Sequence, residues 1–224
     1  MSKLRVAVVG LGFIATRRHL PLWAKQTDSE LVAITDVSEE AVRDATQRFG
    51  VPAGFSDIDE MLETAKPDIV DLCTPPRTHK ALAEKAMAAG SHVILEKPMA
   101  MSYEECQSLV ECSRETGRKL SVIHNMLFYP PVVRVRKMIR DGEIGEFRGM
   151  RIFIANPAEE YLGADGWVHG LPGGLIGETG PHVVYLSLAF IGDVLEIYAR
   201  RRKMADYAWS SGDDFTIDLH GSNG

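Results

Sequence analysis

The sequence predicts an α/β protein in which a doubly wound parallel sheet precedes an α+β domain with a largely antiparallel, incomplete sheet. Three observations favour this fold class. Short apolar runs alternate with helical patterns throughout residues 1–123, which is typical of parallel strands joined by crossover helices. A glycine-rich turn follows the first apolar run. The alternation stops after Asn125, and longer strands without crossover helices indicate antiparallel pairing.

The predicted elements of the first 123 residues come from apolar runs, capping residues and glycine stops. Strands are expected at 4–9, 31–35, 69–73, 92–96 and 119–123. Helices are expected from residue 16 onward, at 39–49, from 57 onward, at 78–89 and at 102–116. Ser38 and Ser102 suit N-caps, Gly50 and Gly117 suit helix ends, and Pro21 should kink or shorten the first helix.

The turn after the first strand reads Gly10-Leu11-Gly12-Phe13-Ile14-Ala15. This is the pattern G-x-G-x-x-A, in which glycines permit a tight turn and a helix N-terminus offers N–H groups to a pyrophosphate. Glycines also make ordinary turns, but the position between a strand and a helix favours a dinucleotide site in a Rossmann domain. Gly10, Gly12, Phe13 and Ile14 are therefore candidate cofactor residues.

Asp36 ends the second predicted strand, 24 residues after Gly12. An acid at this place accepts hydrogen bonds from an adenosine ribose and repels a 2′-phosphate. The alternative is a carboxylate that merely flanks the next helix. We favour ribose binding, and hence NAD as the cofactor, while Arg17 and Arg18 keep NADP as an alternative.

The third strand ends in Thr74-Pro75-Pro76-Arg77-Thr78-His79. Thr74 and Pro75 lie at its carboxyl end, where ligands bind in open α/β sheets, and are candidate cofactor residues. His79 faces the cofactor or is a partly exposed surface histidine, and its spacing does not decide between the two.

The next strand stops abruptly at Glu96-Lys97-Pro98. Because this motif also lies at a carboxyl strand end, we expect Lys97 to stand where a nicotinamide meets a substrate hydroxyl. Glu96 is expected to fix the ribose or the lysine. Pro98 is a candidate for a cis peptide that aims Lys97 into the cleft.

The second domain, residues 124–224, is predicted to contain a helix at 130–141 and a segment at 177–191. Strands are expected at 147–155, 194–200 and 215–220. Glu178 and His182 are four residues apart and would share one helix face, which suits removal of a hydroxyl proton. The alternative is a capped helix start with an incidental histidine. The final Asn223-Gly224 is a hairpin signal without a following strand, so the chain looks cut at a turn.

Composition excludes several classes of protein. The net charge is −6, and the basic run Arg200–Lys203 follows a predicted strand, so we expect no nucleic-acid partner. The three cysteines include no CxxC pair, which argues against a disulfide framework or a zinc site and suits a reducing cytoplasm. No apolar run reaches the length of a membrane span or resembles a signal peptide.

The order of these motifs resembles the Gfo/Idh/MocA family, named for glucose–fructose oxidoreductase and myo-inositol dehydrogenase. The matching features are GLGFIA, Asp36, TPPRTH, EKP, Asn125 in HNMLF, and GG…E-x-G-x-H. The resemblance implies an NAD(P)-binding Rossmann domain at 1–123 and a substrate and oligomerisation domain at 124–224. It also implies that the protein pairs through its C-terminal sheet as a homodimer or homotetramer.

By the same resemblance, Lys97 and His182 are the catalytic pair, and Glu178 replaces the family's usual aspartate. Asn125 and Trp167 are candidate substrate contacts, although Asn125 is equally well a structural turn residue. The expected reaction is oxidation of a secondary alcohol of a sugar or polyol. His182 accepts the proton, Lys97 stabilises the oxygen, and Lys97 is an alternative base.

The chain departs from the family pattern in ways that bear on the substrate. Leu127 and Val168 stand where family members often carry arginine, which argues against carboxylated or phosphorylated substrates. Family members also continue through further strands. The alternatives to a sugar dehydrogenase are an NAD-dependent glycosidase and a catalytically silent NAD-binding regulator.

Overall fold

The computed structural model describes residues 2–155, 171, 173–204 and 214–223. The chain divides into two compact units, Met1–Ile123 and His124–Gly224. The first unit carries the predicted alternation of strands and helices, and the second contains helices and a small antiparallel sheet.

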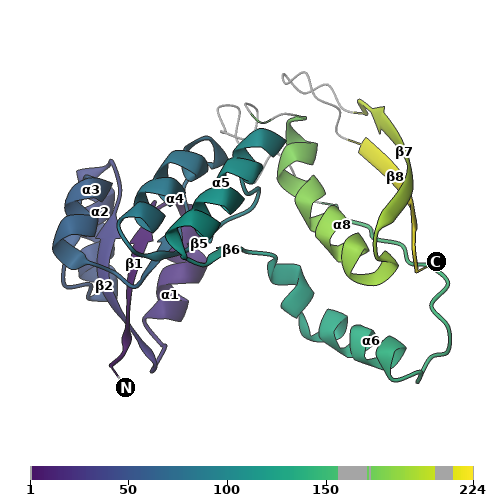
Figure 1. The fold of residues 1–224 in the computed structure, drawn as a ribbon, viewed down its shortest axis with the longest axis horizontal. Coiled ribbons are helices and arrows are strands. Elements are labelled where there is room, and N and C mark those ends of the chain that lie inside the picture. Colours follow the sequence, from purple (N-terminus) through teal and green to yellow (C-terminus); the bar gives the residue numbers. More distant parts are fainter. Residues whose placement is uncertain (1, 156–170, 172, 205–213, 224) are drawn as a thin grey trace. The chain divides into compact units, whose positions relative to one another are not determined.

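A single parallel sheet forms the centre of the first unit, in the order β3-β2-β1-β4-β5-β6 (Figure 1). Its strands are β1 (Leu4–Val9), β2 (Ser29–Thr35), β3 (Gly54–Phe55), β4 (Ile69–Leu72), β5 (His92–Leu95) and β6 (Leu120–Val122). The predicted doubly wound parallel sheet is confirmed, and the short β3 is an addition to it.

The strand order reverses between the neighbours β1 and β4. From β1 the chain winds outward to β3 on one side, and from β4 it winds outward to β6 on the other. Ligands of doubly wound sheets bind outside the carboxyl ends of the strands at such a reversal. The turns that follow β1 and β4 therefore flank the expected ligand position.

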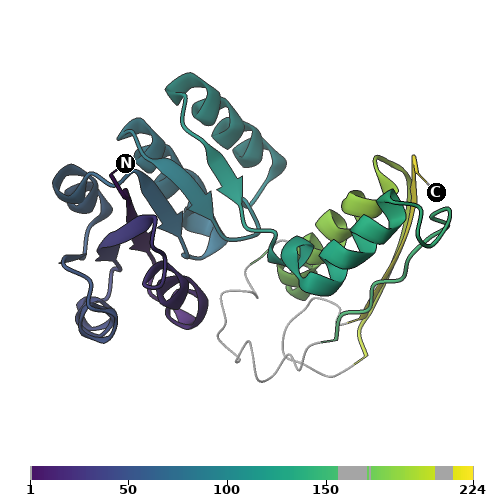
Figure 2. The same ribbon diagram turned by 90° about the horizontal axis from the view of Figure 1, so that it is seen from below.

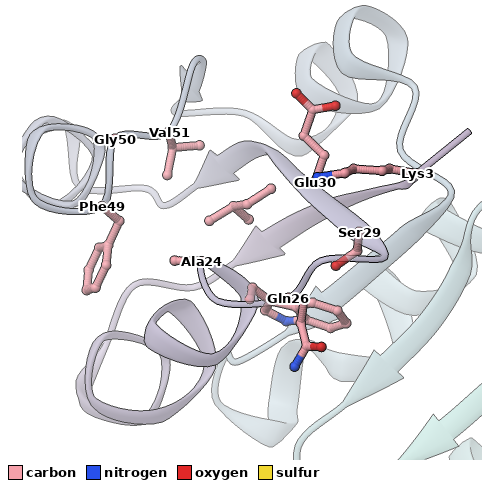
Figure 3. A pocket seen from close by; sticks show the side chains of 10 residues that line it. Lys3, Ala24, Gln26, Ser29, Glu30, Phe49, Gly50 and Val51 are labelled. Carbon is pink, nitrogen blue, oxygen red and sulfur yellow. The ribbon is translucent and has the colours of Figure 1, made fainter.

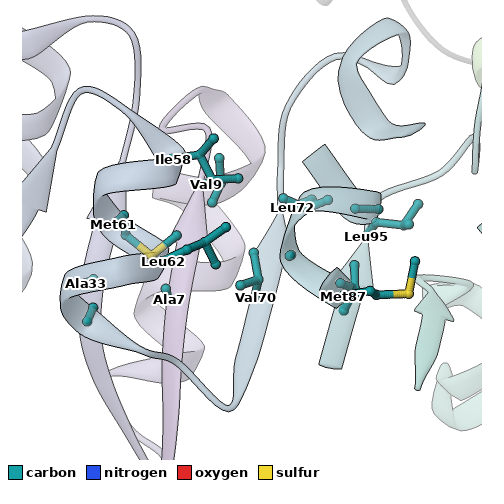
Figure 4. Packing of buried hydrophobic residues seen from close by; sticks show 14 of the residues in the cluster. Ala7, Val9, Ala33, Ile58, Met61, Leu62, Val70, Leu72, Met87 and Leu95 are labelled. Carbon is teal, nitrogen blue, oxygen red and sulfur yellow. The ribbon is translucent and has the colours of Figure 1, made fainter. Parts of the chain in front are cut away.

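Helices cover both faces of this sheet. They are the π-helix η1 (Ala15–His19), α1 (Leu20–Trp23), α2 (Glu39–Phe49), α3 (Ile58–Ala65), the 3-10 helix η2 (Pro76–Thr78), α4 (His79–Ala88) and α5 (Tyr103–Thr116). One buried cluster joins α3, α4 and α5 to the sheet (Figure 4), with members such as Val9, Met61, Val70, Leu72, Met87 and Leu95. A second joins α1 and α2 to it, with Val8, Leu20, Ile34 and Val42.

Local capping explains where several helices begin and end. The Ser38 hydroxyl accepts a hydrogen bond from Ala41 N, and the Ser102 hydroxyl accepts one from Glu105 N. Gly50 and Gly117 end their helices in the left-handed conformation, which costs glycine little. These predicted caps are confirmed.

The first helical segment is wound unusually. Leu20 N donates to Ala15 O, five residues back, so η1 is a π-helix. Pro21 follows and has no N–H to donate, and α1 ends at Trp23. Pro21 lies inside this helical segment rather than at its end, so the expected kink or shortening stays a prediction.

The second unit contains the 3-10 helix η3 (Asn125–Phe128), α6 (Pro130–Arg140) and α8 (Leu175–Ile191). Strands β7 (Val194–Arg202) and β8 (Asp214–Gly221) pair antiparallel, and α8 lies beside this pair (Figure 2). Asn223 N donates to Ile191 O at the end of α8. In the described part of the chain, no helix is long and apolar enough to cross a membrane.

The strand predicted at 147–155 is wrong. Those residues are described and form no strand. A strand requires a hydrogen-bonded partner, and β7 and β8 pair only with each other among the described residues. The sequence of residues 147–155 alternates as a strand would, but among the described residues no neighbouring strand forms hydrogen bonds with it.

We expect Gly10→Ala to destabilise the first unit by about 1–3 kcal/mol. Gly10 has φ +87°, and a Cβ there would lie 2.7 Å from Thr74 Cγ2 and 3.0 Å from the Cys73 carbonyl carbon. Gly12→Ala is the matched control, because a Cβ at Gly12 meets nothing within 4 Å. Urea unfolding, monitored by circular dichroism, measures the stability of both variants. Equal stability of the two would contradict this account of Gly10.

Candidate active site

The glycine turn after β1 is fastened to the end of β2 by Asp36. Leu11 N donates to Asp36 Oδ2 at 2.7 Å, and Ser38 N donates to Oδ1 at 2.9 Å. The bond from Ser38 N is what the alternative interpretation predicts, in which Asp36 flanks the next helix. The bond from Leu11 N was not predicted. Each carboxylate oxygen can accept a second hydrogen bond, so a ribose hydroxyl remains an acceptable donor to Asp36.

The four candidate residues of the turn have different environments. Gly10 is enclosed by the end of β4, and Ile14 packs against the second buried cluster. Gly12 is exposed with open space around it, and Phe13 is 67% exposed. The first intrahelical bond here runs from Thr16 N to Gly12 O, so the preceding N–H groups have no partner one helical turn back. The open side of Gly12 and these amides fit a pyrophosphate.

Thr74 and Pro75 form the matching turn at the end of β4. The Thr78 hydroxyl lies 2.9 Å from Thr74 Oγ1 and 2.8 Å from Pro75 O, which closes this turn. Thr74 and Pro75 are both half-buried, and Thr74 abuts Gly10. The turns after β1 and β4 thus meet where the strand order reverses.

The structure corrects both expectations for His79. Its side chain is 0% exposed, so it is not a surface histidine and has no surface to present to a cofactor. Its Nδ1 lies 3.0 Å from Pro98 O and its Nε2 lies 2.8 Å from Thr74 O. Burial lowers the pKa of His79 despite these carbonyls. The ring therefore ties the loop after β4 to the loop after β5 from inside the protein.

Glu96 and Lys97 stand at the carboxyl end of β5. Lys97 N donates to Glu96 Oε2 at 3.1 Å, and the predicted cis peptide is present between Lys97 and Pro98. The Lys97 side chain is half-buried. Burial disfavours the Glu96 charge, but the hydrogen bond and charge of His19, together with the backbone N–H and charge of Lys97, outweigh burial and lower the Glu96 pKa.

A buried cluster of charged groups lies behind this motif. His19 Nδ1 is 2.8 Å from Asp71 Oδ2, and His19 Nε2 is 3.1 Å from Glu96 Oε1. Trp23 Nε1 donates to Asp71 Oδ2 at 2.6 Å. The His19 and Asp71 side chains are 9% and 1% exposed. One imidazole therefore bridges a carboxylate inside β4 to a carboxylate at the end of β5.

His19 is charged in this setting. Burial opposes its charge, but hydrogen bonds to Asp71, Cys73 and Glu96 outweigh burial and raise its pKa to about 12. A protonated ring donates through both nitrogens, as two carboxylate partners require. Burial raises the pKa of the Cys73 thiol to about 12, and this thiol lies 3.8 Å from Asp71 Oδ1.

The donor atoms of His19, Asp71 and Cys73 lie within 4.8 Å of one another, as metal ligands do. Metal binding requires a neutral imidazole and favours a thiolate. Here the imidazole is charged and the thiol keeps its proton. The donor set therefore fits a hydrogen-bonded ion cluster better than a metal centre.

In the second unit, α8 carries both Glu178 and His182. His182 Nδ1 lies 2.6 Å from the Tyr185 hydroxyl, which is 3.2 Å from Asn125 Oδ1. Tyr185 thus joins His182 to Asn125, two of the predicted substrate residues. Trp167 lies outside the described residues.

A pocket of about 250 Å³ lies elsewhere in the first unit (Figure 3). Its lining includes Lys3, Ser29 and Glu30, which stand near the amino ends of β1 and β2. The candidate cofactor residues lie at the carboxyl ends, so this pocket is not the proposed site.

Four residues of these networks belong to none of the predicted motifs: His19, Trp23, Asp71 and Tyr185. An acid inside the apolar strand Ile69–Leu72 was the available signal for the first three, because a buried carboxylate needs a donor or a cation. The signal for Tyr185 was its place three residues after His182 on one helix.

Comparison with known families agrees with this geometry. Residues 4–124 match the Gfo/Idh/MocA model described as "Oxidoreductase family, NAD-binding Rossmann fold", and residues 132–224 match the "GFO/IDH/MocA C-terminal domain". The chain belongs to the Gfo/Idh/MocA family. Its first unit is accordingly an NAD-binding Rossmann fold.

Similar proteins are named as dehydrogenases. D-apiose dehydrogenase of Paraburkholderia graminis is 28% identical over 89% of this chain and 52% of its own length. D-glucoside 3-dehydrogenase of Escherichia coli is 30% identical over 74% of this chain and 46% of its own. The chain thus spans about half the length of these curated relatives.

Among solved structures, the WlbA dehydrogenase from Bordetella pertussis, in complex with NADH and UDP-GlcNAcA, is similar. The TM-score is 0.87 at 28% identity, and the match covers 100% of this chain and 68% of that one.

We expect His19→Gln to flatten the pH dependence of stability. The folded-state pKa of His19 lies above its ordinary 6.5, so the stability from its charge is complete below pH 6.5 and is lost as the pH rises toward about 12. As the pH rises above 6.5, the free energy of unfolding of the wild-type protein should therefore fall by up to about 1.4 kcal/mol per pH unit because of this group. The variant should lack that slope and be about 3–5 kcal/mol less stable near neutrality.

Urea unfolding between neutral and mildly alkaline pH measures the two slopes. The Glu96 contribution has the opposite sign: its pKa is lowered, so its stabilisation is lost only as the pH falls through that value, outside this window. His220→Gln is the matched control, because that side chain is 64% exposed. Parallel slopes for wild type and His19→Gln would contradict a charged His19.

Proposed function

We propose that the protein is an NAD(P)-dependent oxidoreductase acting on a secondary alcohol of a sugar or polyol. The observation that carries the proposal is the meeting of the Gly10 and Thr74 turns where the strand order reverses, with Lys97 at the end of the next strand. The exposed Gly12 leaves room for a pyrophosphate. The same strand ends then bring a cofactor ring toward Lys97.

Bound nicotinamide supplies the hydride acceptor. The chain's own residues remove the proton of the substrate hydroxyl and stabilise the negative charge that develops on its oxygen. Lys97 donates a hydrogen bond to the reacting oxygen and stabilises its developing negative charge. His182 accepts the proton, with Glu178 sharing the resulting charge, and Lys97 is the alternative base. Asn125 and Trp167 contact the substrate.

The cofactor is NAD rather than NADP, because Asp36 offers a negative charge where NADP would carry a phosphate. The substrate is an uncharged sugar or polyol. Leu127 and Val168 supply no cationic side chain at positions where arginine would bind a carboxylate or phosphate.

The proposed division of labour follows the two units: residues 1–123 bind the dinucleotide, and residues 124–224 form the substrate and oligomerisation domain. We place the protein in the cytoplasm as a homodimer or homotetramer that pairs through the β7–β8 sheet. Support for this pairing comes from large apolar side chains exposed on β7, where Leu195 is 64% and Ile197 67% exposed. Exposed apolar patches commonly mark interfaces.

We expect the 224-residue chain to reduce NAD with at least one neutral sugar or polyol, and Lys97→Met to lower kcat roughly 100- to 1,000-fold. The Kd for NAD should stay within about twofold, since only a hydrogen bond to the reacting oxygen is lost. NADH absorbance measures turnover, and calorimetry measures NAD binding. Lys25→Met, at an exposed position, is the control.

Other results would favour the alternatives. NAD binding without turnover of any substrate would favour a regulatory protein. Glycoside cleavage without net NADH formation would favour an NAD-dependent glycosidase. Full turnover by Lys97→Met would remove Lys97 from the mechanism.

We expect Asp36→Asn to lower the ratio of kcat/KM with NAD to that with NADP roughly tenfold, the worth of one charge-assisted hydrogen bond of about 1.5 kcal/mol. Asparagine keeps an oxygen for one backbone donor but removes the charge that repels a 2′-phosphate. Asp44→Asn on the exposed face of α2 controls for net charge. An unchanged ratio would mean that Asp36 only fastens the glycine turn.

A further inference from the structure

Lys97 lies just beyond the hydrogen-bonded part of β5. Glu96 N donates to Leu72 O at 3.0 Å and so continues the pairing of β5 with β4 past the end of the strand. Lys97 N, the next amide along the chain, donates instead to Glu96 Oε2 at 3.1 Å. Pro98 follows and has no N–H with which to pair again. A side-chain carboxylate therefore holds the lysine backbone at the point where the pairing of the strand ends.

The carboxylate that holds Lys97 N is itself held from the core. Glu96 Oε1 lies 3.1 Å from His19 Nε2, and the other nitrogen of that ring lies 2.8 Å from Asp71 Oδ2. The Glu96 side chain is 14% exposed and the His19 side chain 9%. Because His19 is protonated, both of its nitrogens donate. Each oxygen of Glu96 thus accepts from its own donor, one in the core and one on the lysine backbone.

The ring of His19 can join the two carboxylates because its donors are on two different atoms. Asp71 belongs to β4 and is 1% exposed, so the central sheet fixes its position. The imidazole is rigid and donates to Asp71 from one nitrogen and to Glu96 from the other. A glutamine carries both of its side-chain N–H groups on a single nitrogen and would not bridge the pair in this way. The sheet therefore fixes the Glu96 carboxylate through the imidazole.

We infer that His19 is a positioning residue for catalysis: through Glu96, it holds the backbone of Lys97 where the lysine side chain reaches the reacting oxygen. The inference rests on the proposed function in that it concerns the lysine assigned to that oxygen. Of the two roles expected for Glu96, it assigns the one of fixing the lysine. The alternative, in which Glu96 fixes the ribose, predicts a different result in the binding measurement below.

Kinetics and cofactor binding together test the role of His19. A catalytic group misplaced by about 1 Å can cost about 100-fold in rate, so His19→Gln should lower kcat about 10- to 100-fold. The Kd for NAD should stay within about twofold, because the glycine turn keeps its own bond from Leu11 N to Asp36. NADH absorbance measures turnover. Calorimetry counts the NAD sites, so that kcat is expressed per folded protein.

Trp23→Phe is the matched control, because it removes a different hydrogen bond from the same buried cluster. The lost bond is the one from the indole N–H to Asp71, and the bond between His19 and Glu96 stays in place. This variant should lower the urea midpoint of unfolding and keep wild-type kcat per NAD site. An equal loss of kcat in Trp23→Phe and His19→Gln would mean that His19 acts only through stability, and would overturn the inference.

Hydrogen exchange at the Lys97 amide tests the positioning without any substrate. In the wild type, the bond to Glu96 should protect this N–H from exchange. His19→Gln releases Glu96 from the core and should speed exchange at Lys97 roughly tenfold, as expected when one charge-assisted hydrogen bond is lost. Trp23→Phe should keep the wild-type rate. An unchanged exchange rate at Lys97 in His19→Gln would overturn the inference.

Glu96→Gln keeps the test decisive if His19→Gln does not fold. An amide has one accepting oxygen, so it cannot accept from both His19 and Lys97 N. The charged imidazole should keep that oxygen, and Lys97 N then loses its acceptor. Glu96→Gln should therefore reproduce both the loss of kcat and the faster exchange at Lys97. Glu40→Gln, at an exposed position on α2, is its control and should change neither.

The remaining outcomes separate the inference from its alternatives. If His19 acts through Glu96, the double variant should lose no more kcat than the worse single variant, whereas multiplied losses would mean independent roles and overturn the inference. A Kd for NAD that rises as much as kcat falls would place Glu96 at the ribose and also overturn it. Faster exchange at Lys97 in His19→Gln, with no turnover of any substrate by the wild type, would support the positioning of Lys97 and remove the proposed function.

Discussion

A carboxylate inside the central strand β4 is the constraint on which the first unit depends. Asp71 is 1% exposed and sits between the apolar residues Val70 and Leu72. An unpaired charge at such depth would cost several kcal/mol. The indole N–H of Trp23 and the charged ring of His19 both bond to Asp71 and offset that cost. The first helical segment must therefore lie over this point of the sheet.

The same imidazole extends the constraint to the candidate active site. His19 bonds Glu96 through its second nitrogen, and Glu96 accepts from the backbone of Lys97. His79 Nδ1 lies 3.0 Å from Pro98 O and so holds the next residue but one along the chain. The strand end that presents Lys97 is thus held by two buried histidines, one charged and one with a lowered pKa. Hydrogen bonds from the core, rather than the surface loops alone, define the position of the lysine backbone.

Features that depend on residues close together in the sequence could be predicted. Contacts between residues far apart in the sequence could not. The glycine turn, the caps at Ser38 and Ser102 and the cis peptide before Pro98 depend on neighbouring residues, and the sequence indicated each of them. The bond between His19 and Asp71 spans 52 residues, and the bond between Met126 and Tyr185 spans 59. No local pattern carries such pairings. The segment 147–155 failed for the same reason, because an alternating pattern does not reveal whether a partner strand exists.

The π-helix of Ala15–His19 has a consequence for how this chain can vary. A π turn holds one more residue than an α turn would, and here that residue sets the angular position of His19. Removing any single residue between Gly12 and His19 would turn the imidazole by about 100° around the helix axis and away from both carboxylates. The side chains of Phe13, Arg17 and Arg18 in this segment are exposed and can be replaced, whereas the number of residues in the segment cannot change. The number of residues between the glycine turn and His19 is thus set by the need to place its charge beside Asp71 and Glu96, rather than by the volume of the side chains packed there.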